Sequence, residues 1–173
     1  MDLHKIYFYT ATILGWKPLL TKLLYKELII QSLKFLKDNR KIVVYGFVIM
    51  PNHIHLIWEL LEMNGKESPH SSFMKYVSHE ILKDMVASGS KELSSYAVVS
   101  KTRKHQFWQR GALPIHLYKD QVIYQKLDYV HNNPVQGKWM LADSPIDYHY
   151  SSARFYEYEQ NDFGILTHIG DRV

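Results

Sequence analysis

The stretch YGFVIMPNHIHLIWEL, residues 45–60, joins two apolar runs through a Pro-Asn pair. Proline suits the first central position of a tight turn, and asparagine suits the second. The sequence therefore predicts strands over residues 41–50 and 53–61 that pair with each other as a hairpin. Within the second run, His53 and His55 stand one residue apart between apolar side chains.

The two histidines share one face of their strand, because successive side chains point to opposite faces. Ile54, Leu56 and Trp58 point to the other face, where they would pack under helices. Two imidazoles at this spacing, with Cβ atoms about 7 Å apart, can bind one metal ion. The spacing is equally consistent with two surface histidines on a half-solvated sheet. A structural zinc site is disfavoured, because such sites need four ligands and the chain has no cysteine.

Hydrophobic periodicity and turn residues predict the other elements of the chain. They are a strand over 5–14, a helix over 19–38, a helix over 71–88 capped by Ser71 or Ser72, a strand within 105–118, and a helix that begins near Asp120 and ends by Asn133. The last helix must stop there, because Pro134 disfavours helical backbone in the residue before it.

The predicted order, β-α-β-β-α-β-α, is that of the ferredoxin-like split βαβ with one helix added. We expect an α+β fold, with a ferredoxin-like (RRM-like) antiparallel sheet, helices on one face, and the other face free for a site. Residues 1–140 would form the functional domain, and the added helix would be its last element. Residues 141–173 are expected to form a tail, either part of the same domain or a surface extension.

The composition excludes several classes of protein. The 173 residues are 46% hydrophobic and 22% charged, which is ordinary for one globular domain. The start, MDLHKIYFYT, lacks the basic and long apolar regions of a secretory signal. No apolar run approaches the roughly 18 residues that a membrane span needs. We expect a cytoplasmic protein without a membrane partner, and the net charge of +4 suits a polyanionic partner.

The predicted last helix presents a tyrosine away from its packing face. In DQVIYQKLDYVHNNPV, residues 120–135, the apolar stripe consists of Ile123, Leu127 and Val130. Tyr129 lies about 200° round the helix from Leu127, so it faces away from the stripe. Lys126 and Asn133 share its side at i−3 and i+4. The alternative is an ordinary surface tyrosine, since the chain has 13 tyrosines.

Together, these side chains define a specific chemistry. A phenol is a poor nucleophile at neutral pH, but beside a metal-bound phosphate it can attack phosphorus and become a covalent phosphotyrosine. The side chains of His53, His55, Tyr129 and Asn133 supply the groups that this reaction needs. The Asn133 carboxamide offers a hard oxygen ligand that suits Mg²⁺ or Mn²⁺.

Two motifs, GFVIMPNHIHLIW at residues 46–58 and LDYVHNNPVQGKW at residues 127–139, resemble those of the IS200-like single-tyrosine transposases. These are His-hydrophobic-His (HUH) endonucleases. Within this family the chain most resembles the branch associated with repetitive extragenic palindromes (REPs), of which the NNP ending is typical. The resemblance covers roughly residues 5–140, and the order of the motifs and the predicted fold agree with it.

The resemblance implies a metal-dependent endonuclease and strand transferase that cleaves single-stranded DNA near a hairpin. His53 and His55 would bind Mg²⁺ or Mn²⁺, and Tyr129 would be the nucleophile that leaves a 5′-phosphotyrosine and a free 3′-OH. Many insertion-sequence members carry glutamine four residues after the tyrosine as a third metal ligand. Here that position is Asn133, one methylene shorter. Insertion-sequence relatives exchange the tyrosine helix across a homodimer, whereas the palindrome-associated branch can act as monomers, and both states stay open here.

The segment KTRKHQFWQR, residues 101–110, predicts a contact with nucleic acid. Its cations are Lys101, Arg103, Lys104 and Arg110, and Lys126 adds a further cation beside the tyrosine. Cations bind phosphates and rings stack on bases, and Phe107 and Trp108 are interleaved with these cations. The alternative is a solvated basic loop that leads into a buried Phe-Trp strand.

Three other readings of function stay open. The same element order serves RNA-recognition domains, although the chain lacks their aromatic Lys/Arg-Gly-Phe-Gly-Phe signature. A non-catalytic hairpin-DNA-binding protein derived from a transposase would keep the same fold. Other HUH enzymes, such as replication initiators and relaxases, are usually larger than 173 residues.

Overall fold

The predicted hairpin forms half of a four-stranded antiparallel sheet in the computed structural model, which describes residues 1–100 and 104–173. The strands are β1 (Ile6–Thr12), β2 (Ile42–Ile49), β3 (His53–Leu60) and β4 (Ile115–His116). β3 pairs with β2 on one side and with β1 on the other, and β4 pairs with β1. The strand order β2-β3-β1-β4, with all neighbours antiparallel, confirms the ferredoxin-like α+β fold.

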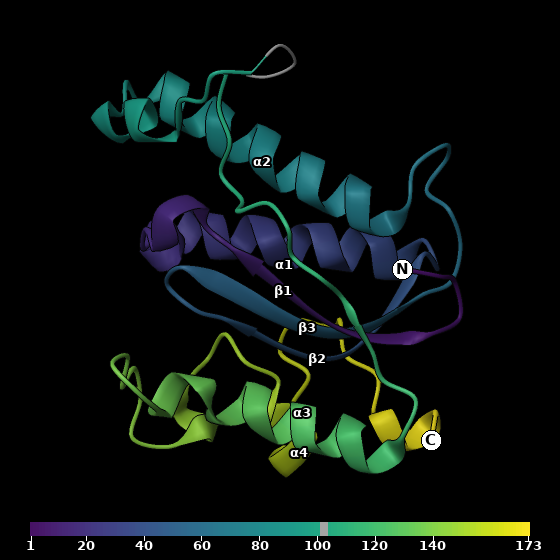
Figure 1. The fold of residues 1–173 in the computed structure, drawn as a ribbon. Coiled ribbons are helices and arrows are strands. Elements are labelled where there is room, and N and C mark those ends of the chain that lie inside the picture. Colours follow the sequence, from purple (N-terminus) through teal and green to yellow (C-terminus); the bar gives the residue numbers. More distant parts are fainter. Residues whose placement is uncertain (101–103) are drawn as a thin grey trace.

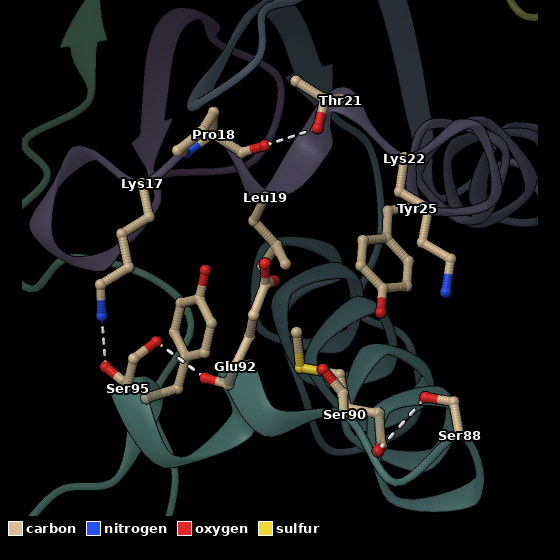
Figure 2. Close-up of a pocket in the computed structure, with 12 residues that line it drawn as sticks. Lys17, Pro18, Leu19, Thr21, Lys22, Tyr25, Ser88, Ser90, Glu92 and Ser95 are labelled. Carbon is tan, nitrogen blue, oxygen red and sulfur yellow. Dashed lines mark hydrogen bonds between the residues drawn. The ribbon is translucent and has the colours of Figure 1, made fainter.

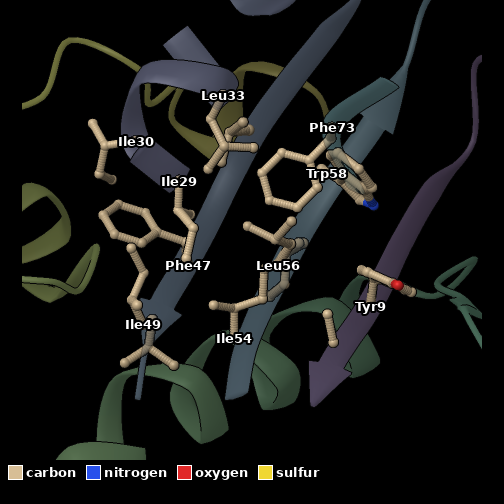
Figure 3. Packing of buried hydrophobic residues seen from close by; sticks show 14 of the residues in the cluster. Tyr9, Ile29, Ile30, Leu33, Phe47, Ile49, Ile54, Leu56, Trp58 and Phe73 are labelled. Atoms are coloured by element: carbon tan, nitrogen blue, oxygen red, sulfur yellow. The ribbon is translucent and has the colours of Figure 1, made fainter. Parts of the chain in front are cut away.

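Two helices cover one face of this sheet. They are α1 (Leu23–Asp38) and α2 (Pro69–Ala87), which lie on the same side of the strands in Figure 1. Their apolar residues meet the strand side chains that point towards them, and Figure 3 shows Leu33 and Phe73 near Leu56 and Trp58. Ile54, Leu56 and Trp58 are at most 1% exposed, which confirms their predicted burial under the helices.

A third layer covers the opposite face, which we expected to be free. It consists of α3 (Asp120–Asn132) and α4 (Ala153–Tyr158), both on the far side of the sheet from α1 in Figure 1. α3 approaches β2 closely at Gly46, where an added Cβ would lie 2.7 Å from Cδ1 of Leu127. The expectation of a free face is therefore wrong, because the apolar stripe of α3 needs a buried partner and finds it on this face.

Both helices of the first layer begin differently from the prediction. α1 starts four residues later than position 19, because Lys22 has extended backbone (φ −69°, ψ 122°). α2 begins at Pro69 with Ser68 as its N-cap, in place of the predicted Ser71 or Ser72. The Ser68 hydroxyl accepts a hydrogen bond from the Ser71 N–H at 3.2 Å. Proline fits the first helical position, where an N–H would have no partner within the helix.

Little of residues 105–118 forms the expected fourth strand. Only the two residues of β4 form a ladder with β1, and Trp108 makes an isolated bridge to Ile13. Gly111 has a φ of 83° and Pro114 has no N–H, so the backbone between these two contacts cannot continue a ladder.

The C-terminal segment, residues 141–173, packs against the sheet. It packs along β2, where the Ile49 N–H donates a hydrogen bond to the Tyr150 carbonyl at 2.9 Å. Ile165 and Ile169 have no exposed surface. Of the two alternatives for this segment, its burial favours a part of the same domain over a surface extension. The sequence does not separate them, because the apolar residues of this segment follow no helical or strand period that would reveal their burial.

Candidate metal and tyrosine site

His53 and His55 lie side by side on the α3 face of the sheet. Antiparallel pairing with β1 places Thr12 opposite His53 and Thr10 opposite His55. The two imidazole centroids are 4.7 Å apart, and the two residues are only 8% and 4% exposed. The reading of two surface histidines is therefore wrong, since the third layer of the fold covers them.

Each imidazole has its Nδ1 atom held by a neighbouring side chain. Nδ1 of His53 lies 2.7 Å from Oδ1 of Asn52, and Nδ1 of His55 lies 2.7 Å from the Thr10 hydroxyl. A proton on Nδ1 leaves Nε2 with a free lone pair. Within the described ranges, Nε2 of His55 is buried and has no hydrogen-bond partner. An imidazole that is oriented through Nδ1 and has a bare Nε2 is the arrangement found in metal-bound histidines.

The surroundings of both imidazoles favour their neutral form. Burial lowers the pKa of His55 to about 3, and the nearby His53 and Lys126 contribute to the same shift. Burial also lowers the pKa of His53, while a side-chain hydrogen bond with Asn133 acts in the opposite direction. Only neutral imidazole binds a metal ion, so protons compete weakly for these two side chains near neutral pH.

α3 brings Tyr129 to the same place. Its ring centroid lies 5.2 Å from that of His55 and 6.0 Å from that of Phe8. Lys126 has its Nζ atom 4.8 Å from the Phe8 centroid and 5.5 Å from the Tyr129 centroid. Tyr129 is 47% exposed, so a substrate can reach it from solvent. The structure thus brings Tyr129, His53 and His55 of one chain together.

These groups line one open cavity of about 750 Å³. Side chains of β1 and β3 form one part of its wall, and α3 together with the residues that follow it, up to Trp139, forms another. Trp16, in the connection between β1 and α1, completes the lining. The cavity is therefore bounded by elements that are far apart in the sequence.

The side chains in this cavity fit a hard divalent cation. The described part of the chain has no cluster of three or more His, Cys, Asp or Glu side chains that could hold a metal ion. Asn133 lines the cavity at the C-cap of α3, and its carboxamide is the group that would supply a third donor. Two neutral imidazoles and one amide oxygen leave coordination positions for water and phosphate oxygens, as Mg²⁺ and Mn²⁺ require.

The cations that we predict to bind nucleic acid lie in different places. Lys126 lines the cavity, whereas Lys101 and Arg103 lie outside the described residues. Lys104 is exposed. Arg110 lines a separate groove beside α2 and donates a hydrogen bond from Nε to Oε1 of Gln106 at 3.2 Å.

The aromatic pair in the same segment is buried. Phe107 and Trp108 are 3% and 7% exposed, and Phe107 packs against Tyr96 with ring centroids 5.0 Å apart. The expectation that these rings stack on bases is therefore wrong. The burial of Phe107 and Trp108, which the alternative predicts, is confirmed, but the strand that it places there does not form, since Trp108 makes only an isolated bridge to Ile13.

Several residues of the cavity have little signal in the sequence. Thr10 and Phe8 reach it only through the pairing of β1 with β3, and the register of that pairing cannot be derived from one sequence. Asn52, which contacts Nδ1 of His53 without lining the cavity, fits a turn, and its position next to His53 is the one available sign of a second role. Trp16 lies in a short 3-10 turn without any periodic pattern.

The fold of the chain has a counterpart among solved structures. No protein-family model and no curated protein matches the chain. Its structure is similar to that of a REP-associated tyrosine transposase bound to a REP hairpin, with a TM-score of 0.62 and 19% sequence identity. The match covers 94% of this chain and 85% of that chain. The chain therefore has the fold of a tyrosine transposase. Within the described ranges, no helix has both the length and the apolarity that a membrane crossing needs.

Proposed function

We propose that the protein is a metal-dependent endonuclease and strand transferase for single-stranded DNA, of the tyrosine-transposase type. The observation that carries this proposal is the meeting of Tyr129 with His53 and His55 in one cavity of one chain, 5.2 Å between the Tyr129 and His55 ring centroids. The likeness to a transposase solved with a REP hairpin supports hairpin DNA as the partner. The protein would act on DNA in the cytoplasm.

The chain's own residues would divide the reaction between them. The Tyr129 hydroxyl oxygen attacks the phosphorus of a backbone phosphate and forms a bond to it, while the bond from phosphorus to the 3′ oxygen breaks. The phenol loses its proton to solvent, and the departing 3′ oxygen takes up a proton. The products are a 5′-phosphotyrosine and a free 3′-OH. Lys126, whose Nζ lies 5.5 Å from the Tyr129 centroid, supplies positive charge for the phosphate oxygens.

The histidines and Asn133 would hold Mg²⁺ or Mn²⁺, which supplies polarisation of a phosphate oxygen when it is bound. Asn52 and Thr10 orient the two imidazoles through their Nδ1 atoms. Phe8 stacks on the His55 ring with centroids 5.2 Å apart, and this contact shields one face of that ring from water.

Formation of a covalent adduct tests the proposal. The protein is mixed with Mn²⁺ and a labelled pool of DNA hairpins with randomised single-stranded flanks, and the products are separated under denaturing conditions. We expect a protein–DNA adduct with the unmodified chain, and none with Tyr129→Phe or after a chelator removes the metal. Tyr124→Phe is the matched control, because Tyr124 lies on the same helix, is 44% exposed and does not line the cavity.

The outcomes separate the two leading functions. An adduct that persists in Tyr129→Phe would exclude Tyr129 as the nucleophile. Hairpin binding without any adduct, at every metal concentration, would favour a non-catalytic hairpin-DNA-binding protein derived from a transposase. In both cases Tyr124→Phe should behave as the unmodified chain does.

A further inference from the structure

Trp16 lines the cavity of about 750 Å³ that contains Tyr129, His53 and His55, which we call the tyrosine cavity. The chemistry proposed above gives Trp16 no role. It ends the 3-10 turn Leu14–Trp16 that follows β1, and it is 63% exposed. It shares the cavity with His53 and Tyr129. An indole so open to solvent is not held there by burial of its own ring, so packing does not explain its place.

The backbone at Trp16 is strained. Its φ is 58°, in the left-handed region that large side chains rarely adopt, and Gly15 before it has a φ of 68°. Backbone of this kind persists only where the surroundings hold it, and it concentrates at functional sites. The chain thus keeps an unfavourable conformation that presents an exposed indole at the rim of the cavity.

One buried amide links the backbone of Trp16 to His53. Nδ2 of Asn52 donates a hydrogen bond to the Trp16 carbonyl at 3.3 Å, and Oδ1 of the same side chain lies 2.7 Å from Nδ1 of His53. Asn52 is 1% exposed, so few other positions are open to it. The Trp16 N–H also donates to the Ile13 carbonyl at 2.9 Å. The backbone of Trp16 is therefore fixed relative to His53.

The next residue anchors the turn on its other side. Figure 2 shows the Lys17 ammonium donating a hydrogen bond to the Ser95 carbonyl, within a second cavity of about 490 Å³. The same ammonium lies 4.5 Å from the ring centroid of Tyr96. Lys17 therefore faces the second cavity, and Trp16 is the residue of this turn that lines the tyrosine cavity.

We propose that Trp16 forms a nucleobase-binding subsite, in which its indole stacks on a base next to the phosphate that Tyr129 attacks. This inference rests on the function proposed above. Aromatic rings bind bases of single strands by stacking, with little preference for sequence. Trp139, the other indole of the cavity, packs partly against the hydrophobic core, so Trp16 is the ring with a free face.

The test compares one substitution on two ligands, in the Tyr129→Phe background so that no covalent step interferes. The ligands are a short deoxyadenosine oligonucleotide and an abasic oligonucleotide of the same length. Trp16→Gly removes the indole while glycine keeps the left-handed backbone accessible. We expect about 5- to 150-fold weaker binding of the deoxyadenosine strand, which corresponds to the ~1–3 kcal/mol of one stacked base. Binding of the abasic strand should not change.

Two further measurements complete the design. Indole fluorescence should be quenched by the deoxyadenosine strand and not by the abasic strand, and this quenching should disappear in Trp16→Gly. Phe35→Ala is the matched control, because Phe35 is 58% exposed on α1, on the opposite face of the sheet. It should bind both strands as the background does. Thermal unfolding checks that each variant is folded.

Each outcome decides the inference. A loss confined to the base-containing strand supports the subsite. An equal loss on both strands would show that Trp16 only maintains the turn, and the absence of a loss, or of any binding to begin with, would also overturn the subsite. If the base-dependent loss appears but the hairpin pool yields no adduct, the endonuclease proposal fails, and Trp16 is a base-stacking residue of a DNA-binding protein without that reaction.

Discussion

Thr10 contacts one ring nitrogen of His55 and leaves the other without a partner among the described residues. Its hydroxyl lies 2.7 Å from Nδ1, and Nε2 of that ring is buried and has no hydrogen-bond partner in the ranges described. Thr10→Val keeps the shape of the side chain and removes this contact. We expect the affinity for Mn²⁺, measured by calorimetric titration, to fall about 10- to 100-fold, as when the hydrogen-bond partner of a metal-bound histidine is removed.

Thr12→Val is the matched control for Thr10→Val. Thr12 lines the same cavity on the same strand, but Nδ1 of its neighbour His53 is held by Asn52. Its Mn²⁺ affinity should stay close to that of the unmodified chain. An unchanged affinity in Thr10→Val would mean that Thr10 does not orient His55 for a metal.

His131 should make the stability of the fold depend on pH. Burial lowers its pKa to about 4, whereas an unfolded chain would have a histidine pKa near 6.5. Between these values the unfolded chain binds more protons, so the free energy of unfolding decreases as the pH falls from about 7 to about 4. We expect this one side chain to contribute about 1–2 kcal/mol of the loss between pH 7 and pH 5.

Urea denaturation at both pH values measures this contribution. His131→Gln should show a smaller loss between pH 7 and pH 5 than the unmodified chain, because glutamine does not titrate. His149→Gln is the control, because the His149 side chain is 49% exposed. If the free energy of unfolding depends on pH equally in the unmodified chain and in His131→Gln, the His131 imidazole does not cause that dependence.

Gly46 allows α3 to pack on the sheet. A Cβ at this position would lie 2.7 Å from Cδ1 of Leu127, a buried side chain of α3. Gly46→Ala should therefore displace the helix that carries Tyr129. We expect a loss of about 1–3 kcal/mol in the free energy of unfolding, typical of an overpacked core, together with slower adduct formation.

A second substitution shows whether the clash is the cause. In the Gly46→Ala background, Leu127→Ala removes the atom that the new methyl group meets. Its cost in the free energy of unfolding should be smaller there than in the unmodified chain, where about 2–5 kcal/mol is ordinary for a buried leucine. The pairing of β2 with β3 has a register shift between Val44 and Gly46, and equal costs in the two backgrounds would place the effect of Gly46→Ala in this irregularity of the strand.

The elements that could be predicted from the sequence are those with local causes. The hairpin follows from a Pro-Asn turn between alternating runs, and the apolar stripe of α3 follows from helical periodicity. The predicted bounds of the two strands and of α3 therefore agree with the structure to within a residue or two. The partner of that stripe was missed, because the close approach at Gly46 depends on a contact about 80 positions away in the chain. The histidines and Tyr129 could be identified, but not the side chains of β1 that hold them.

The C-terminal end of the chain pairs with a buried carboxylate of the sheet. Nε of Arg172 donates to Oε2 of Glu59 at 3.0 Å, and the hydroxyl of Tyr45 donates to the same oxygen at 2.7 Å. Glu59 is 4% exposed and lies on the same face of β3 as His53 and His55. The C-terminal segment thus supplies the positive charge that the buried carboxylate of Glu59 needs. Only the folded chain reveals this pairing, because its members are more than a hundred positions apart.

The placement of Tyr129 beside His55 of its own chain predicts the result of mixing two defective variants. Tyr129→Phe lacks the phenol, and His55→Ala lacks an imidazole. If each chain carries a whole site, neither can lend the missing part to the other, so their mixture should form no adduct with the hairpin pool. Adduct formation in the mixture would instead show that chains exchange α3.

The same feature sets how activity responds to dilution. A site assembled within one chain does not depend on an encounter between protomers, so its activity per molecule should be constant across protein concentrations. A single copy of such a protein could then begin to cut DNA without first finding a second one, which matters most in a cell that makes very few copies.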